Sequence, residues 1–237
     1  MEKETAIGII FESPEYDVYS QMAADETLCG CNDAAYILRF FHWSGMGITH
    51  GYSQRRSQVE ACAGQAMDNY RDIVRRPTGG GIVFHKDDVT FSFIFPSPEL
   101  LFEPHKAYAR IHGAINEKYR ECGEVFSLSS EQTKDYSVNS PAMACFSKPV
   151  SLDIMQGDKK ILGGALRKLG NRMLYQGSFQ LPEARKRQKF HERTIAEALV
   201  REFRIVWQQR PFSKELIERT EELAIGKYRT EEWNRRI

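Results

Sequence analysis

Two residues in the second half of the chain could together carry out acyl transfer. Cys145 supplies a thiol that, as a thiolate, attacks a carbonyl group and can then hold an acyl group as a thioester. Lys160 follows 15 residues later. A nearby ammonium group favours the thiolate and can hold a substrate carbonyl oxygen or protonate a leaving group. The structural alternative remains open for both, because free cysteines are mostly buried and lysines are mostly solvated.

A run of three glycines (Gly79, Gly80 and Gly81) precedes an apolar segment. Consecutive glycines cost backbone entropy and add no packing. A functional reason for them is close approach of the main chain to a ligand, with N–H groups free to hold an anion or a carbonyl oxygen. The alternative is a flexible or left-handed turn between strands. The run matches neither a P-loop nor a dinucleotide-binding fingerprint.

The remaining candidates for chemistry are weaker. His85, at the end of a predicted strand, could donate a hydrogen bond to a substrate, and a structural role is the alternative. Cys29 and Cys31 have the wrong spacing for a typical zinc knuckle, so we expect no metal site. The Gly-x-Ser-x-Gly pattern of a serine hydrolase is absent from the sequence.

The segments around these residues predict an α+β protein with a mixed β-sheet flanked by helices. We expect strands over residues 5–12, 36–43, 72–76, 81–85, 89–96, 152–155, 160–168 and 173–181, and helices over residues 16–28, 57–67 and 105–122. After Pro182 the pattern becomes helical, with Thr194 and Glu197 as a capping box and Ser213 as a second N-cap. The predicted division is a catalytic domain over residues 1–182 and a small C-terminal helical appendage over residues 183–237.

The amino-acid composition limits the class of protein to which this chain can belong. The 237 residues are 41% hydrophobic and 27% charged, with a net charge of +1. This balance indicates a globular protein and marks neither a nucleic-acid partner nor a membrane surface. The five cysteines are too few and odd in number for a secreted disulfide framework, and the first residues do not resemble a signal peptide. We therefore expect a cytoplasmic protein.

Several motifs, in their order, resemble the biotin/lipoate ligase superfamily, in particular its lipoate-protein ligase A and octanoyltransferase branch. Residues 75–81 (Arg-Arg-Pro-Thr-Gly-Gly-Gly) are similar to the family's Arg-Arg-x-Ser/Thr-Gly-Gly-Gly signature, and residues 160–163 (Lys-Ile-Leu-Gly) to its Lys-x-x-Gly signature. Within the branch, the cysteine-dependent octanoyltransferases are most similar. They share a Cys-Phe pair 15 residues before the lysine, which here is Cys145 and Phe146.

The resemblance implies an enzyme that transfers an octanoyl or lipoyl group to a lysine of lipoyl domains of 2-oxoacid dehydrogenases or of the glycine-cleavage H protein. The donor would be octanoyl (acyl) carrier protein, acting through a Cys145 thioester with Lys160 as the second catalytic residue. No cofactor is then needed, and we expect a monomer. One alternative is a lipoate–protein ligase that forms lipoyl-AMP from lipoate with ATP and Mg. A biotin-protein ligase and an inactive binder of lipoyl domains are further alternatives.

The same resemblance implies a set of substrate-binding residues around an apolar acyl site. They are Arg76, Thr78, Gly79, Gly80, Gly81, His85, Gly163, Gly164, Ala165, Gln176 and Gly177. Two positions depart from the family pattern. Gln176 stands where the family usually has histidine, and residues 164–166 (Gly-Ala-Leu) replace the common Ser-Ala-Gln.

Overall fold

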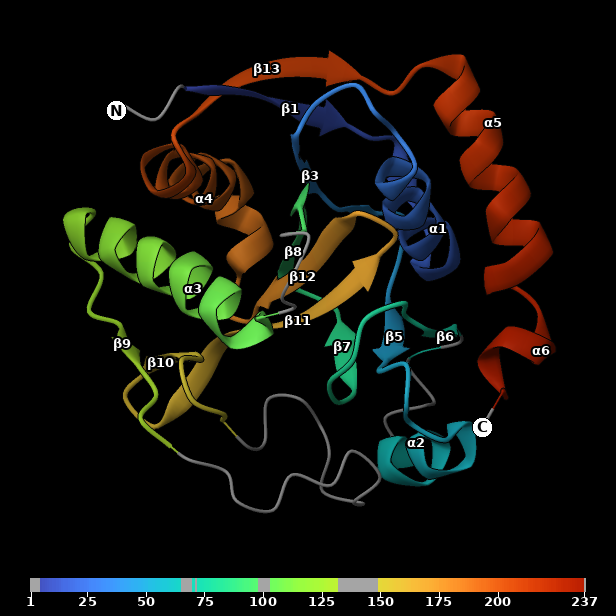
Figure 1. Ribbon diagram of the computed structural model, residues 1–237. Coiled ribbons are helices and arrows are strands. Elements are labelled where there is room, and N and C mark those ends of the chain that lie inside the picture. The colour runs from blue at the N-terminus through green and yellow to red at the C-terminus, as the bar shows by residue number, and fades with distance from the viewer. Residues whose placement is uncertain (1–4, 65–69, 71, 98–102, 132–148, 237) are drawn as a thin grey trace.

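An eight-stranded mixed sheet forms the centre of the protein, whose computed structural model describes residues 5–64, 70, 72–97, 103–131 and 149–236 (Figure 1). In sheet order its strands are β13 (Ile205–Pro211), β1 (Ala6–Glu12), β3 (Tyr36–Phe40), β8 (Val89–Pro96), β12 (Arg172–Phe179), β11 (Lys159–Leu169), β10 (Ile154–Gln156) and β9 (Ser127–Leu128). Strand β1 is parallel to β13 and β3, and the other neighbours are antiparallel. The predicted α+β class is confirmed.

Helices cover both faces of this sheet because its central strands are apolar on both faces. Helices α3 (Pro104–Glu121) and α4 (Gln188–Phe203) lie on one face, and α1 (Val18–Cys29) and α5 (Lys214–Leu223) on the other (Figure 1). In β8, Phe91 and Phe93 pack in the cluster that includes Ile111 of α3, whereas Ile94 packs in the cluster that includes Leu28 of α1. The side-chain alternation of a strand thus builds two cores from one segment.

A three-stranded sheet in the order β6 (Ile73–Arg75), β5 (Gly47–His50), β7 (Val83–His85) lies beside the main sheet, next to α2 (Arg56–Ala63) (Figure 1). The glycine-rich segment connects β6 to β7. A further pair, β2 (Glu15–Tyr16) and β4 (His42–Trp43), is parallel. The small sheet therefore carries the glycine-rich segment to the edge of the central sheet.

The segment after Pro182 contributes a strand as well as helices. It contains η2 (Ala184–Arg187), α4, β13, α5, η3 (Ala224–Tyr228, a π-helix) and α6 (Glu231–Asn234). Strand β13 was not predicted. It pairs with β1 along its whole length, from Ala6 opposite Ile205 onward. The C-terminal segment therefore supplies β13, an edge strand of the central sheet.

The two helix starts predicted in this segment have different outcomes. The capping box is wrong, because Thr194 lies inside α4 and its hydroxyl donates to the Phe190 carbonyl oxygen at 2.8 Å. Ser213 does cap α5, since its Oγ accepts a hydrogen bond from the Leu216 N–H at 3.2 Å.

Among the described residues, no helix has the length and apolarity needed to cross a bilayer.

Candidate active site

A pocket lies where the small sheet meets the central sheet. Its lining comes from α1, β5, β7, β8, β11 and β12, and from the segments around Phe41 and Arg76. Seven lining residues belong to the predicted site, namely Arg76, His85, Gly163, Gly164, Ala165, Gln176 and Gly177. The remaining lining residues are Met22, Phe41, Thr49, Val83, Thr90 and Ser178. Apolar side chains and glycine backbone thus share the pocket wall with a few polar groups.

The glycine-rich segment is held close to the end of β5. Gly80 has φ +88°, a left-handed conformation that favours glycine. A Cβ atom on Gly51 would lie 1.9 Å from the carbonyl oxygen of Gly80, so the two segments touch through their main chains. Arg76 turns back onto the segment, and its Nε and Nη2 donate to the Gly79 carbonyl oxygen at 3.0 and 2.5 Å. Thr78, Gly79, Gly80 and Gly81 are not themselves lining residues, but a Cβ atom on Gly80 would lie 3.8 Å from Ala165 Cβ, so the segment borders the pocket.

Gln176 ties this segment to a buried ion pair. The Thr78 hydroxyl donates to Gln176 Oε1 at 2.6 Å, and Gln176 Nε2 donates to Asp25 Oδ2 at 2.7 Å. Asp25 also accepts from Arg39 Nε and Nη2 at 2.9 and 2.6 Å and from the Ser92 hydroxyl at 2.6 Å. The Asp25 and Arg39 side chains are both fully buried. The residue that departs from the family pattern is therefore a fully bonded link between the central sheet, α1 and the glycine-rich segment.

Lys160, near the start of β11, lies against the glycine-containing part of the same strand. Its Nζ forms an ion pair with Asp153 Oδ2 at 2.8 Å, and both side chains are buried. A Cβ atom on Gly163 would lie 2.6 Å from this Nζ, so the ammonium group lies against a pocket-lining residue. The Tyr108 hydroxyl donates to Asp153 Oδ1 at 2.5 Å and accepts from the Gly164 N–H at 3.0 Å. Burial, and then the charge of Asp153, raise the pKa of Tyr108 well above its usual value, so it stays neutral.

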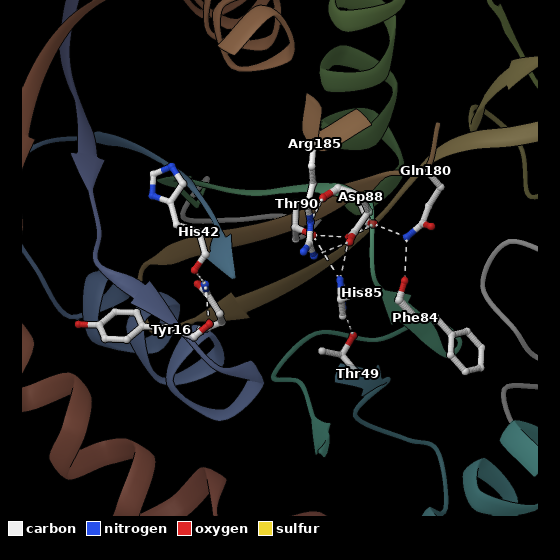
Figure 2. A network of polar contacts seen from close by, with 11 residues as sticks. Tyr16, His42, Thr49, Phe84, His85, Asp88, Thr90, Gln180 and Arg185 are labelled. Carbon is white, nitrogen blue, oxygen red and sulfur yellow. Dashed lines mark hydrogen bonds and ion pairs between the residues drawn. The ribbon is translucent and has the colours of Figure 1, made fainter. Parts of the chain in front are cut away.

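His85 lies between a carboxylate and a hydroxyl (Figure 2). Its Nδ1 is 2.8 Å from Asp88 Oδ2, and its Nε2 is 2.9 Å from the Thr49 hydroxyl. The indole ring of Trp43 stacks on the imidazole with 4.4 Å between centroids. Both Thr49 and His85 line the pocket. The geometry of carboxylate, imidazole and hydroxyl is one that can move a proton.

The sequence predicted much of the pocket wall but few of the partners behind it. Asp25, Asp88, Asp153 and Thr49 were not predicted as site residues. Asp88 follows His85 by three residues in a turn, which is a signal that sequence reasoning could have used. The other three reach the site only through strand pairing and helix packing. The predicted nucleophile, Cys145, lies outside the described residues, so its distance from Lys160 stays a prediction.

Residues 17–187 match the family model of the lipoyl protein ligase A/B catalytic domain. The chain belongs to this family. The matched residues include the glycine-rich segment, Lys160, Gln176 and the three buried carboxylates of the site. The pocket described above is therefore built within the shared catalytic domain of lipoyl protein ligases.

Curated relatives of this lipoyl ligase family member carry the name octanoyltransferase LipM. The protein from Moorella thermoacetica is 30% identical over 173 residues, which cover 70% of this chain and 62% of that relative. The protein from Lysinibacillus sphaericus is 27% identical over 260 residues, which cover 90% of this chain and 93% of the relative. Against the Moorella protein the chain thus spans less than two thirds of the relative's length.

Solved structures of lipoate protein ligases share the fold. Protein Ta0514 from T. acidophilum, solved with bound lipoic acid, superposes with a TM-score of 0.76 at 19% identity, over 98% of this chain and all of that one. A lipoate-protein ligase A bound with ATP superposes with a TM-score of 0.74 at 20% identity, over 97% and 98% of the two chains. The sheet and its flanking helices are therefore those of lipoyl protein ligases.

Proposed function

We propose that this protein transfers an octanoyl group from octanoyl carrier protein to a lysine of a lipoyl domain, through a thioester on Cys145. One observation carries the proposal: the Lys160 ammonium group lies against Gly163 and the glycine-rich segment lies close to Ala165, and both of these residues line one pocket with a partly apolar wall. The names of the curated relatives supply the acyl group.

In the proposed reaction the Cys145 thiolate attacks the thioester carbonyl of the donor, and the thiolate of the carrier protein leaves. The lysine amine of the acceptor domain then attacks the enzyme thioester, an amide bond forms, and the Cys145 thiolate is released. Negative charge develops on the carbonyl oxygen in both steps. Lys160, oriented by Asp153, and main-chain N–H groups near Gly80 are the groups that stabilise it.

Apolar side chains of the pocket provide the contacts for the acyl chain. Met22, Phe41 and Val83 line it, and Gly163 and Gly177 present backbone where side chains would fill the space. A saturated chain gains about 0.8 kcal/mol for each CH₂ group that it buries. Polar residues such as Thr49 and Gln176 also line the pocket, so its lining offers contacts for both the acyl chain and the carbonyl group.

Mass spectrometry of the protein after mixing with octanoyl carrier protein tests the covalent route. We expect an octanoyl adduct on Cys145 that disappears when apo lipoyl domain is added. Cys145→Ala should abolish both the adduct and the transfer, whereas Cys122→Ala, at an exposed cysteine that ends α3, should change neither. An active Cys145→Ala protein would refute the thioester.

Lipoate–protein ligase activity is the second candidate, and the fold shared with ligases that bind lipoic acid and ATP favours it. In that reaction lipoate and ATP form lipoyl-AMP, and Cys145 forms no thioester. Pyrophosphate release that depends on lipoate, with transfer to apo lipoyl domain that survives Cys145→Ala, would establish this function in place of the first.

A further inference from the structure

A hydrogen-bonded chain runs from the buried Asp88 carboxylate through His85 to the Thr49 hydroxyl at the pocket wall (Figure 2). Asp88 Oδ2 also accepts from the Thr90 hydroxyl at 2.5 Å and from the Ser178 hydroxyl at 2.8 Å. These donors come from β8 and β12, so the central sheet holds the carboxylate in place. Whether the Asp88 carboxyl group is ionised sets the donor and acceptor roles along this series of hydrogen bonds.

Asp88 is ionised at neutral pH. Burial by itself raises the pKa of Asp88, but the adjacent His85 and the hydroxyl donors outweigh it, and the pKa lies below its usual value. Arg185 adds a cation 3.4 Å from Asp88 Oδ1. An ionised carboxylate can only accept hydrogen bonds, so the imidazole carries its hydrogen on Nδ1. In the neutral imidazole Nε2 is then the acceptor, and the Thr49 hydroxyl is the donor.

Three charged groups belong to this hydrogen-bonded chain or contact it. Asp88 lies behind the imidazole, Arg185 of η2 contacts Asp88, and Arg76 Nη1 is 3.3 Å from Thr49 Oγ1. Arg76 stabilises negative charge on the Thr49 oxygen, and Asp88 stabilises positive charge on His85. The surrounding charges therefore favour movement of a proton from the hydroxyl to the imidazole.

The proposed reaction needs a base that Lys160 does not supply. The acceptor lysine has an ordinary pKa of about 10.4, so at neutral pH it arrives as an ammonium ion and must lose protons during the attack. Lys160 donates to the Asp153 carboxylate as a cation and has no lone pair for another proton. His85 lines the same pocket as Gly163, the residue against which Lys160 lies, and its neutral imidazole has a lone pair on Nε2.

We propose that His85, oriented by Asp88, is the general base for attack by the acceptor lysine, and that the Thr49 hydroxyl relays the proton. In this step the N–C bond forms and the bond from the acyl carbon to its leaving group breaks, with the electron pair going to the leaving group. One proton of the lysine ammonium group passes to Thr49 Oγ1 as the Thr49 proton passes to His85 Nε2, and the second is lost to water as the amide forms. The imidazolium then returns its proton to the leaving group or to water.

This inference rests on the proposed function in one respect, namely that a lysine amine is the acceptor. It holds for an acyl group on Cys145 and for lipoyl-AMP, because both are consumed by the same attack. The test therefore measures the transfer step alone. Enzyme loaded with its acyl group in a first mix is combined with apo lipoyl domain in a second, and amide formation is followed over a single turnover.

His85→Gln keeps an amide at the position of the ring but cannot accept a proton. We expect loading to proceed as in the parent protein and transfer to slow by about 10²- to 10⁴-fold, the usual contribution of a general base. The remaining rate should rise about tenfold for each pH unit below the lysine pKa of about 10.4, because only free amine then reacts. A purely structural role of His85 would not produce this pH dependence.

Thr49→Val removes the relay hydroxyl at nearly constant volume and should also slow transfer more than loading. Matched controls exist elsewhere in the fold. Two residues of α4 serve as controls for the loss of similar groups. His191 is buried and lies 2.7 Å from the Tyr119 hydroxyl, and Thr194 lies in the same helix. His191→Gln and Thr194→Val should leave the transfer step at the parent rate.

The outcomes separate the two proposals. Parent-like transfer by His85→Gln would overturn the general-base role while leaving the acyltransferase intact. A slower transfer step that keeps the pH dependence of the parent would overturn it as well. If the parent protein itself acylates no lipoyl domain from octanoyl carrier protein or from lipoate with ATP, the proposed function fails, and the role of His85 fails with it.

Discussion

Gly163 contributes to the site because it has no side chain. The Lys160 side chain occupies the position that a larger residue at 163 would fill. A Cβ atom there would lie 2.3 Å from Lys160 Cε and 2.6 Å from its Nζ. The glycine of the Lys-x-x-Gly signature thus has a steric reason within its own strand.

Gly163→Ala should therefore displace the Lys160 ammonium group and weaken its ion pair with Asp153. We expect acyl transfer to fall by about 10- to 10³-fold, consistent with loss or misplacement of one group that stabilises the oxyanion. Steady-state transfer to apo lipoyl domain measures the effect. Gly113→Ala in α3, where an added Cβ meets open space, is the control and should keep full activity. Full activity of Gly163→Ala would show that the Lys160 position is not critical.

Secondary-structure elements are held together at the site by buried polar links. Strand β3 carries Arg39, α1 carries Asp25, and β12 carries Gln176, and these three side chains meet beneath the glycine-rich segment. Gln176 and Asp25 are 151 positions apart in the chain. The network therefore couples the orientation of α1 to that of the pocket wall.

Asp25→Ala should be strongly destabilising, because it leaves the Arg39 guanidinium buried without its carboxylate. Breaking a buried ion pair from one side costs about 3–5 kcal/mol. Urea unfolding followed by circular dichroism measures the loss. The exposed pair of Arg193 and Glu197 on α4 provides the contrast, and Arg193→Ala should change the free energy of unfolding by less than about 1 kcal/mol. Equal effects of the two substitutions would contradict the assigned importance of the buried network.

Across the fold, the last described helix, α6, lies outside the matched family region and contacts the strand that leads to the glycine-rich segment. Asn234 of α6 accepts from the Arg75 N–H at 2.8 Å and donates to the Tyr228 and Thr230 carbonyl oxygens. Arg75 directly precedes Arg76 and the glycine-rich segment. The C-terminal helix thus supports the segment that borders the pocket.

Asn234→Ala should leave the buried Arg75 N–H without a partner and cost about 1–3 kcal/mol. Denaturant unfolding measures this loss. Asn32→Ala, at an exposed position, should change stability by less than about 0.5 kcal/mol. An unchanged midpoint for Asn234→Ala would mean that α6 does not stabilise the main domain through this contact.

Three buried histidines predict how the stability of the whole molecule depends on pH. Burial is the largest cause that lowers the pKa of His50 and of His112 to about 3 and that of His191 to about 4. In the unfolded chain each titrates near 6.5. The stability that each contributes is complete above about pH 6.5 and is lost as the pH falls toward the folded-state pKa.

We therefore expect the free energy of unfolding to fall between pH 6.5 and 4, by about 1.4 kcal/mol per pH unit for each histidine at full effect. Urea unfolding at a series of pH values measures the slope. His191→Gln should make the slope shallower by the share of one histidine. His105→Gln, at an exposed residue of α3, should leave the slope unchanged. A flat pH profile of the parent protein would contradict the burial of these rings.

Features that depend on neighbours along the chain could be predicted from the amino-acid sequence alone. Apolar periodicity predicted most strands and the three helices before Pro182, and the glycine turns at Gly157 and Gly170 lie between paired strands as expected. The Lys-x-x-Gly spacing identified part of the pocket wall, and the glycine run identified a segment that borders it. These signals are local, because backbone conformation and short-range spacing follow from the residues of one segment.

Only the tertiary structure decided which distant groups meet. Asp25, Asp153 and Thr49 reach the site through helix packing and strand register, and no local pattern specifies either. Strand β13 escaped prediction for the same reason: it is a mostly exposed edge strand, and its hydrogen-bond partner β1 lies almost 200 positions earlier in the chain. Buried charges need partners wherever the fold can supply them, and pairing across such separations is a property of the packed molecule.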